Sequence, residues 1–390
     1  MSHESSGSAM DANPGPGSQV EALESLRGVA ALMVVVYHLV ELVHVALPAT
    51  LGFVKTHFGL GVPLFYALSG FVLSHGYQHR LESRGQVRAF FARRFFRIAP
   101  LFYAVVGAWL VIHYLLWDKV QTSQALFLNA TFLYGLVPGA HMSIAWAGWS
   151  IGVEMLFYAL FPFISLWATS GRSAWALFAG SLVFSAAVQN TFLGLSLDSY
   201  AYMNLGTQLP FFMVGVACSR TWADIGYPRS PRWSRILLLA FAAAAVVMVA
   251  VPAAWTFLYS VPMGNLEHNA WTLIFGALVM AACTGRFSLL ESGPLRRLGK
   301  LSFSVYLVHP LIMLAFIELG LSPWLAAHFE RPLVQFLCAA VGAVACIWAA
   351  SELTFRLIEQ PGMALGRRVT MKQAPHAGAA AESVAAPGAR

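Results

Sequence analysis

Charged residues are scarce in this sequence. Only 11% of its 390 residues are Asp, Glu, Lys or Arg, whereas 58% are hydrophobic. A soluble domain usually carries about 25% charged residues, because charge covers the surface that faces water. The composition therefore excludes a soluble globular protein and indicates an integral membrane protein.

Cysteine is also scarce, and the patterns of metal and nucleotide sites are missing. The sequence has four cysteines, all in apolar runs without CxxC spacing: Cys218, Cys283, Cys338 and Cys346. We expect buried, unreactive thiols at these positions. We also expect no metal site, because no metal-ligand spacing, P-loop or GxGxxG is present.

Apolar runs long enough to cross a bilayer recur along the whole chain. No segment between them is large enough for a separate soluble domain. We expect an all-α membrane domain over residues 21–368, with disordered tails at 1–20 and 369–390. The tail before it lacks the pattern of a cleaved signal peptide. We predict ten transmembrane helices, at residues 28–46, 58–78, 98–117, 149–168, 174–192, 205–220, 236–256, 269–285, 301–319 and 333–355.

The basic residues predict the orientation of these helices. If both termini lie in the cytoplasm, every Lys and Arg except Lys55, Lys119 and Arg331 falls on the inner side, as the positive-inside rule requires. An odd number of helices would break this alternation. The net charge of +7 therefore faces the cytoplasmic leaflet and its anions, and it does not indicate nucleic acid.

Two ionisable residues share one face of the first predicted helix, in ESLRGVAALMVVVYH. Arg27 and His38 are eleven residues apart, which is three helical turns plus about 20° and a rise of about 16 Å. Ionisable side chains at membrane depth cost about 2.5–3.5 kcal/mol each on insertion scales, so they are candidates for function. The alternatives are a snorkelling arginine and a histidine that packs between helices.

Polar residues recur in two later helices. Glu154, in AWAGWSIGVEMLFY, shares a helix face with Ser150 one turn earlier. Arg93, Arg94 and Arg97, in FFARRFFRIAP, cover one side of a helical turn. Guanidinium groups bind phosphate oxygens in pairs, which makes this cluster a candidate phosphate clamp. A structural ion pair and simple topology anchoring are the respective alternatives.

Three further residues, together with Ser150, are candidates for lining a substrate pocket. Tyr306 and His309 are separated by three positions in GKLSFSVYLVHPLI, and Ser69 stands in GVPLFYALSGFVLS. Core packing with satisfied polar groups explains Tyr306 and His309 equally well.

These motifs, in this order and spacing, resemble the acyltransferase-3 family of bacterial membrane O-acyltransferases. The resemblance runs from about residue 20 to 368, and it also includes WSIGVEMLFY and FRLIEQP. The sequence departs from the family pattern at three places: Pro63 with Tyr66 in the motif often written GVDLFF, Met155 after Glu154, and Gln360 before the final proline. None of these departures affects Arg27 or His38.

The resemblance implies transfer of an acyl group, usually acetyl from acetyl-CoA, to a hydroxyl of a glycan. The acceptor would be an exopolysaccharide, a lipopolysaccharide or a lipid-linked precursor, and the enzyme would lie in the bacterial inner membrane. We expect Arg93, Arg94 and Arg97 to bind the phosphates of the donor, and Arg27 to hold its diphosphate or its pantetheine arm. His38 would be the general base. Glu154 would set the tautomer of His38 or bind the acceptor.

Two other classes of protein are compatible with charged residues inside a membrane. A secondary transporter or glycan flippase also needs a polar path, but the sequence shows no inverted repeat of Gly- or Pro-broken helices. A structural partner of an envelope-synthesis complex, with a decayed site, would not retain this set of polar residues. Binding of CoA discriminates between an acyltransferase and a flippase, since a flippase has no reason to bind it.

Overall fold

The computed structural model of the protein describes residues 17–77, 81–251 and 266–372, and these contain helices but no strand, which confirms the predicted all-α class. Most of both predicted tails, and residues 252–256 of the seventh predicted span, lie outside the described residues. The longer helices are α1 (Gly17–Glu41), α3 (Gly61–Tyr77), α4 (Arg84–Trp117), α6 (Trp149–Trp167), α7 (Gly171–Gly194), α9 (Leu205–Asp224), α10 (Pro231–Ala250), α12 (Leu266–Thr284), α13 (Gly293–Glu318), α15 (Pro332–Thr354) and α16 (Gln360–Lys372). Shorter elements are α2 (Phe53–His57), α5 (Ser123–Thr131), α8 (Asp198–Tyr202), α14 (Leu321–His328), the 3₁₀ turns η1 (Ala49–Leu51), η2 (Phe58–Leu60) and η3 (Leu133–Leu136), and the π-helical turn η4 (Phe355–Glu359).

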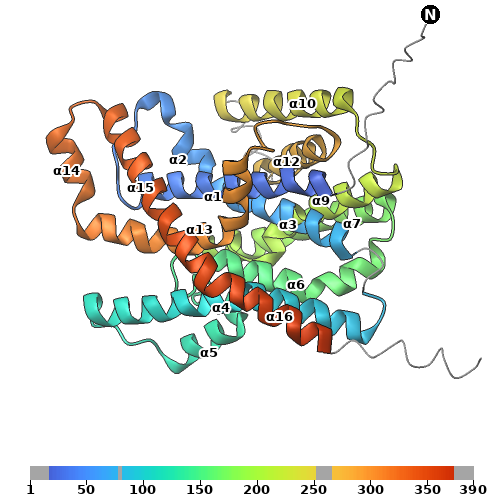
Figure 1. The fold of residues 1–390 in the computed structure, drawn as a ribbon, viewed down its shortest axis with the longest axis horizontal. Helices are drawn as coiled ribbons and strands as arrows, with labels where there is room; N and C mark the ends of the chain where they lie inside the picture. The colour runs from blue at the N-terminus through green and yellow to red at the C-terminus, as the bar shows by residue number, and fades with distance from the viewer. Residues whose placement is uncertain (1–16, 78–80, 252–265, 373–390) are drawn as a thin grey trace, which may run out of the picture.

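Nine helices within the described ranges are long and apolar enough to cross a membrane, and they correspond to nine of the ten predicted spans. The remaining predicted span, 205–220, is helix α9, which does not belong to the nine. Polar residues such as Gln208, Arg220 and Asp224 lower its hydropathy. Most of its side chains are nevertheless buried, because α9 lies between α3 and α7 inside the bundle (Figure 1).

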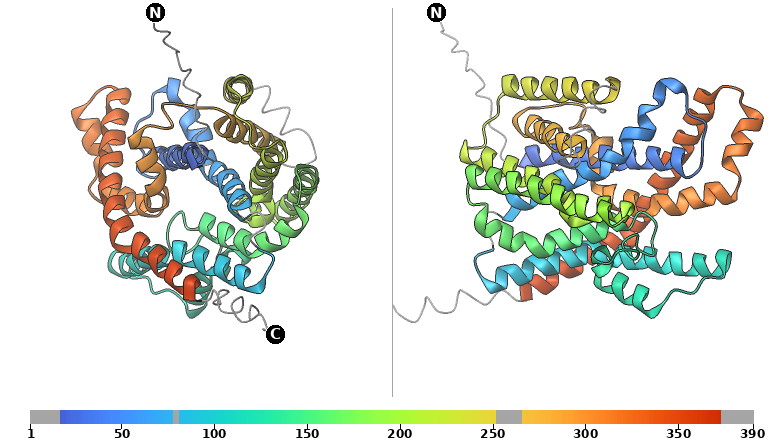
Figure 2. Two further views of the ribbon diagram at one scale, coloured as in Figure 1. Left: turned by 45° about the vertical axis from the view of Figure 1, so that its right-hand side comes forward. Right: turned by 180° about the vertical axis from the view of Figure 1, so that it is seen from behind.

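Helix α1 runs through the middle of the bundle, with α3 and α13 beside it (Figure 2). Its contact with α13 depends on Gly28 and Gly299. A Cβ atom at Gly28 would lie 2.8 Å from the backbone nitrogen of Gly299, and one at Gly299 would clash with the carbonyl oxygen of Glu24. Two glycines therefore let the backbones of α1 and α13 meet directly, which brings polar side chains of both helices together further along.

Helix α4 is longer than a bilayer is thick. Its 34 residues span about 51 Å, against about 30 Å for the hydrocarbon core. Ser83 caps its first turn and makes a reciprocal capping box with Gln86. At its far end α4 and α5 project beyond the other helices, as do α14 and its neighbours (Figure 1).

The prediction of four buried cysteines is wrong for two of them. Cys218 and Cys283 are buried, but Cys338 and Cys346 are exposed on α15. Helix α15 lies at the periphery of the bundle (Figure 2), and a membrane protein turns an apolar face outward to lipid. A cysteine in an apolar run is therefore compatible with either face of such a helix.

Candidate active site

The side chains of His38 on α1 and His309 on α13 contact each other directly. Nε2 of His309 lies 3.0 Å from Nδ1 of His38, and the two rings stack with centroids 4.9 Å apart. Nδ1 of His38 also lies 3.1 Å from the carbonyl oxygen of Val34, and Nδ1 of His309 lies 3.3 Å from that of Val305. A neutral pair satisfies all these contacts in one way only: each ring carries its proton on Nδ1, and Nε2 of His309 accepts from His38. Nε2 of His38 is then unprotonated and has no hydrogen-bond partner among the described residues.

His38 lines a large cavity, which we call the outer cavity because it lies beside segments that the sequence predicts to be outside. It has a volume of about 1140 Å³ and is lined in part by aromatic rings, those of Tyr37, Trp146, Trp149, Tyr202 and Tyr306. Polar side chains contribute as well, among them Lys55, Lys119, Gln121 and Asn129. The cavity is large enough for a ligand of the size of one or two sugar rings, since typical ligand pockets measure about 300–1,000 Å³. His309 is fully buried and lies behind His38.

A second cavity, which we call the arginine cavity, lies among α1, α3, α4 and α6. Its volume is about 20 Å³, and its polar lining consists of Arg27, Ser69, Arg94, Arg97, Glu154 and Tyr158. One carboxylate oxygen of Glu154 accepts hydrogen bonds from Ser69 at 2.7 Å and from Tyr158 at 2.5 Å. These bonds hold Glu154 beside the arginines. His309, not Glu154, contacts the imidazole of His38.

A small middle cavity of about 30 Å³ lies between the other two. It shares Arg27 and Glu154 with the arginine cavity, and Tyr306 with the outer cavity. The Tyr306 hydroxyl accepts a hydrogen bond from Ser150 at 2.6 Å and donates one to the carbonyl oxygen of Ala147 at 2.9 Å. The three cavities therefore form a series that leads from the arginines past Tyr306 to His38.

The arginine cavity carries more positive than negative charge. The guanidinium of Arg94 lies 5.3 Å from the ring centroid of Tyr77 and 5.7 Å from that of Tyr158, distances that suit cation–π contacts. Arg97 forms an ion pair with Glu359 at 3.2 Å. Among the described residues, two carboxylates face Arg27, Arg94 and Arg97, namely Glu154 and Glu359, so one positive charge is in excess. The Nε atoms of Arg27 and Arg94 have no hydrogen-bond partner in the described parts of the chain.

Arg93 is the one predicted donor-binding residue that does not reach this cavity. Its side chain is exposed, and its Nε donates to the hydroxyl of Tyr77 at 3.1 Å. Arg94, the next residue, points inward instead. The spacing of the cluster shows that its members share a side of the helix, but it does not show which of them faces the bundle interior.

Sequence reasoning missed two residues of the site. Tyr158 stands four positions after Glu154, so the i, i+4 relation was available as a signal. Glu359 lies in FRLIEQP, a motif quoted without any role, and its carboxylate is fully buried against Arg97. Among the described residues no group of three or more His, Cys, Asp or Glu side chains is arranged to hold a metal ion.

A bundle of membrane-spanning helices with arginines, carboxylates and a histidine pair in its interior is a membrane protein with a polar functional site. The model of the acyltransferase-3 family, described as an acyltransferase domain, matches residues 20–352. The chain belongs to this family and is a multi-pass membrane O-acyltransferase. The family resemblance of the motifs is thereby confirmed.

Several curated proteins are similar to this chain. The protein named "Putative membrane-bound transacylase BcsY" of Komagataeibacter xylinus is 27% identical over 89% of this chain and 84% of its own length. Acyltransferase MdmB of Streptomyces mycarofaciens is 27% identical over 92% of this chain and 95% of its own length. Peptidoglycan O-acetyltransferase OatA of Listeria monocytogenes is 23% identical over 88% of this chain, which covers 55% of that protein. No solved structure matches the chain.

Proposed function

We propose that this enzyme transfers an acyl group, by default acetyl, from a CoA thioester on the cytoplasmic side to a hydroxyl of a glycan in the outer cavity. The observation that carries the proposal is the series of cavities from Arg27, Arg94 and Arg97 to His38. The acceptor would be an exopolysaccharide, a lipopolysaccharide or a lipid-linked precursor. The enzyme would lie in the bacterial inner membrane with both termini in the cytoplasm.

The donor site is assigned to the arginine cavity because its charge and its unpartnered guanidinium nitrogens suit phosphate oxygens. Arg27 and His38 are separated by about 16 Å along α1, and the extended pantetheine arm of CoA has a comparable length. The arginine cavity, at about 20 Å³, holds no more than a water-sized group. A thioester arm therefore enters only if the side chains around the cavity move apart.

The chemistry follows from the free Nε2 of His38. This nitrogen takes the proton of the acceptor hydroxyl while the hydroxyl oxygen attacks the thioester carbonyl. The new C–O bond forms, the C–S bond breaks, and the proton passes from His38 to the departing CoA thiolate. His309 keeps the Nδ1 proton of His38 in a hydrogen bond, so the lone pair of Nε2 stays directed at the cavity.

The outer cavity supports a carbohydrate acceptor. Aromatic rings pack against the C–H faces of a sugar, while amide and ammonium groups such as those of Asn129 and Lys119 bind its hydroxyls. The name of the Listeria relative, a peptidoglycan O-acetyltransferase, is in keeping with an acceptor of this class.

The test is transfer of label from radioactive acetyl-CoA in inverted membrane vesicles, comparing the natural protein with His38→Ala at equal membrane abundance. We expect label in a glycan or lipid-linked fraction only when His38 is present. Equal transfer by both proteins would show that His38 is not the base. Absence of both transfer and CoA binding, with other acyl donors tested too, would favour the flippase.

A further inference from the structure

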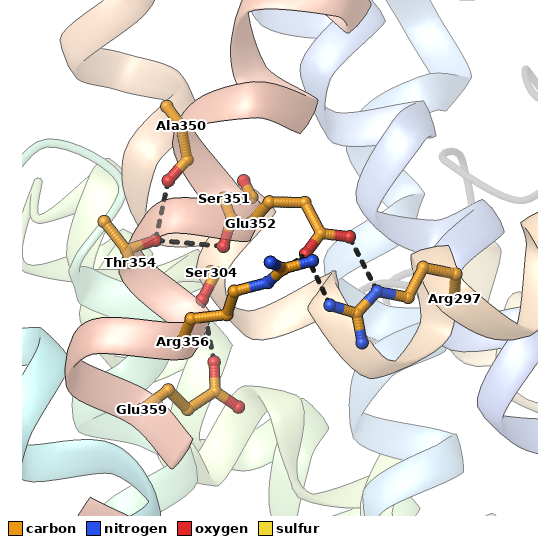
Figure 3. Close-up of polar contacts among 8 residues, drawn as sticks. All are labelled: Arg297, Ser304, Ala350, Ser351, Glu352, Thr354, Arg356 and Glu359. Carbon is orange, nitrogen blue, oxygen red and sulfur yellow. Dashed lines mark hydrogen bonds and ion pairs between the residues drawn. The ribbon is translucent and has the colours of Figure 1, made fainter. Parts of the chain in front are cut away.

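A buried carboxylate supports Arg97 from outside the arginine cavity. The side chain of Glu359 is fully buried, and its Oε1 lies 3.2 Å from Nη1 of Arg97. Its Oε2 accepts a hydrogen bond from Ser304 on α13 at 2.8 Å (Figure 3). Glu359 does not line the arginine cavity, whereas Arg97 does. The carboxylate is therefore anchored to α13 on one side and holds the guanidinium on the other.

The π-helical turn explains why Glu359 points inward. Glu352 and Glu359 are seven residues apart, so a regular α-helix would place them within about 20° of each other. The π turn η4 (Phe355–Glu359) takes in one residue more than an α turn, and one residue corresponds to a rotation of about 100°. The two carboxylates consequently have different partners: Glu352 binds Arg297 and Arg356, whereas Glu359 binds Ser304 (Figure 3). Glu359 also pairs with Arg97.

We propose that Glu359 is a positioning residue for the acyl donor: it holds the guanidinium of Arg97 in the orientation that lines the arginine cavity. This role rests on the proposed function, because it takes the donor phosphates to be the ligand of Arg97. Glu359 also offsets the mutual repulsion of Arg27, Arg94 and Arg97 when no donor is bound. A buried carboxylate costs several kcal/mol in desolvation unless it is paired and hydrogen-bonded, and Glu359 has both kinds of partner.

Arg97 needs such a support because its side chain is a quarter exposed and has several rotatable bonds. Besides Glu359, its Nη1 contacts only a weak acceptor among the described residues, the sulfur of Met363 at 2.9 Å. Removal of the charge on Glu359 leaves the guanidinium free to turn toward the exposed side. Donor binding then has to order the side chain of Arg97 again. This weakens the affinity for the donor but leaves the reacting atoms unchanged.

Glu352 provides the matched control. It lies on the same continuous helix, two turns before Glu359, and binds Arg297 through two hydrogen bonds of 2.6 and 2.5 Å and Arg356 at 3.2 Å (Figure 3). It lines none of the three cavities of the site. Glu352→Gln and Glu359→Gln thus each remove the charge of one carboxylate that is paired with arginine. Only Glu359→Gln removes it beside an arginine of the donor site.

The experiment measures equilibrium binding of CoA to the purified full-length protein in detergent, together with steady-state transfer from acetyl-CoA. For Glu359→Gln we expect the Kd of CoA and the KM of acetyl-CoA to rise about tenfold. This is the effect of weakening one charge-assisted hydrogen bond, that between Arg97 and a donor phosphate. The kcat at saturating donor should stay within about twofold of the natural value. Glu352→Gln should bind CoA like the natural protein.

A second variant tests the same role if Glu359→Gln does not fold. Ser304→Ala retains the charge of Glu359 but removes its anchor on α13, so we expect a smaller rise in the Kd of CoA, about two- to threefold. Natural affinity in Glu359→Gln, or in Ser304→Ala when that is the variant measured, would overturn the positioning role. Tighter binding would also overturn it, because it would mean that the carboxylate competes with the donor phosphates.

The two proposals fail in different ways. If the natural protein does not bind CoA, the donor assignment fails and the role of Glu359 falls with it. If the natural protein binds CoA and both glutamine variants bind it equally well, only the role of Glu359 is overturned.

Discussion

Nε2 of His309 lies 3.0 Å from Nδ1 of His38, and the two rings stack. This contact joins the first long helix of the bundle to α13, and it leaves the opposite nitrogen of His38 directed at the outer cavity. The pair therefore has an internal member, His309, which accepts the hydrogen bond, and a member that lines the cavity, His38, which we propose as the base.

The role of His309 predicts a defect in turnover without a defect in donor binding. In His309→Ala, Nδ1 of His38 keeps only the carbonyl oxygen of Val34 as an acceptor, so the orientation of the His38 ring is less firmly held. We expect kcat to fall about 10²-fold, the lower range for general-base catalysis, with an unchanged Kd of CoA. His309→Gln, whose side-chain oxygen can accept the same hydrogen bond, should recover part of the activity. A loss of CoA affinity with normal kcat would contradict this role.

Two adjacent arginines distinguish a donor-binding side chain from a peripheral one. Arg94 lines the arginine cavity, whereas Arg93 is exposed beside Tyr77. We expect Arg94→Gln to raise the KM of acetyl-CoA at least about tenfold, because a guanidinium–phosphate contact is lost. Arg93→Gln should change it by less than about twofold, although it removes the same charge one residue away. Equal effects would mean that the cluster acts through its overall charge alone.

Because α1 and α13 approach so closely, we expect one added methyl group between them to destabilise the folded protein. In Gly299→Ala the new Cβ atom meets the carbonyl oxygen of Glu24, and overpacking of this kind costs about 1–3 kcal/mol. The thermal midpoint of the purified protein should therefore fall. Gly107→Ala in α4 is the control, since nothing lies within 4 Å of the added atom. A normal midpoint for Gly299→Ala would show that the two backbones can move apart without cost.

The two ends of α4 test the proposed orientation. Arg84 and Lys119, just beyond Trp117, are exposed at opposite ends of this 34-residue helix. In a variant without the four natural cysteines, Lys119→Cys should react with a membrane-impermeant maleimide in intact spheroplasts. Arg84→Cys should react only after the membrane is permeabilised. The reverse pattern would place the arginine cavity toward the outside and exclude a cytoplasmic donor for it.

The sequence by itself determined the class of the protein and which polar residues of a helix share a face. Hydrophobic runs of sufficient length predicted the membrane helices, because the bilayer fixes how many apolar residues a span needs. The helical period predicted that Arg27 and His38 share a face and that Ser150 and Glu154 do, because rotation per residue is a local property of the chain. Motif order indicated the family, which the comparison confirmed.

Only the tertiary structure decided which helices are neighbours, and hence the partners of the polar residues. The contacts of His38 with His309, and of Arg97 with Glu359, join segments far apart in the sequence. The rotation of α4 about its own axis decides that Arg94 points inward and Arg93 outward. A π-helical turn decides the direction of Glu359. These outcomes depend on how whole helices pack, for instance through Gly28 and Gly299, and a local period carries no information about the helix that lies opposite.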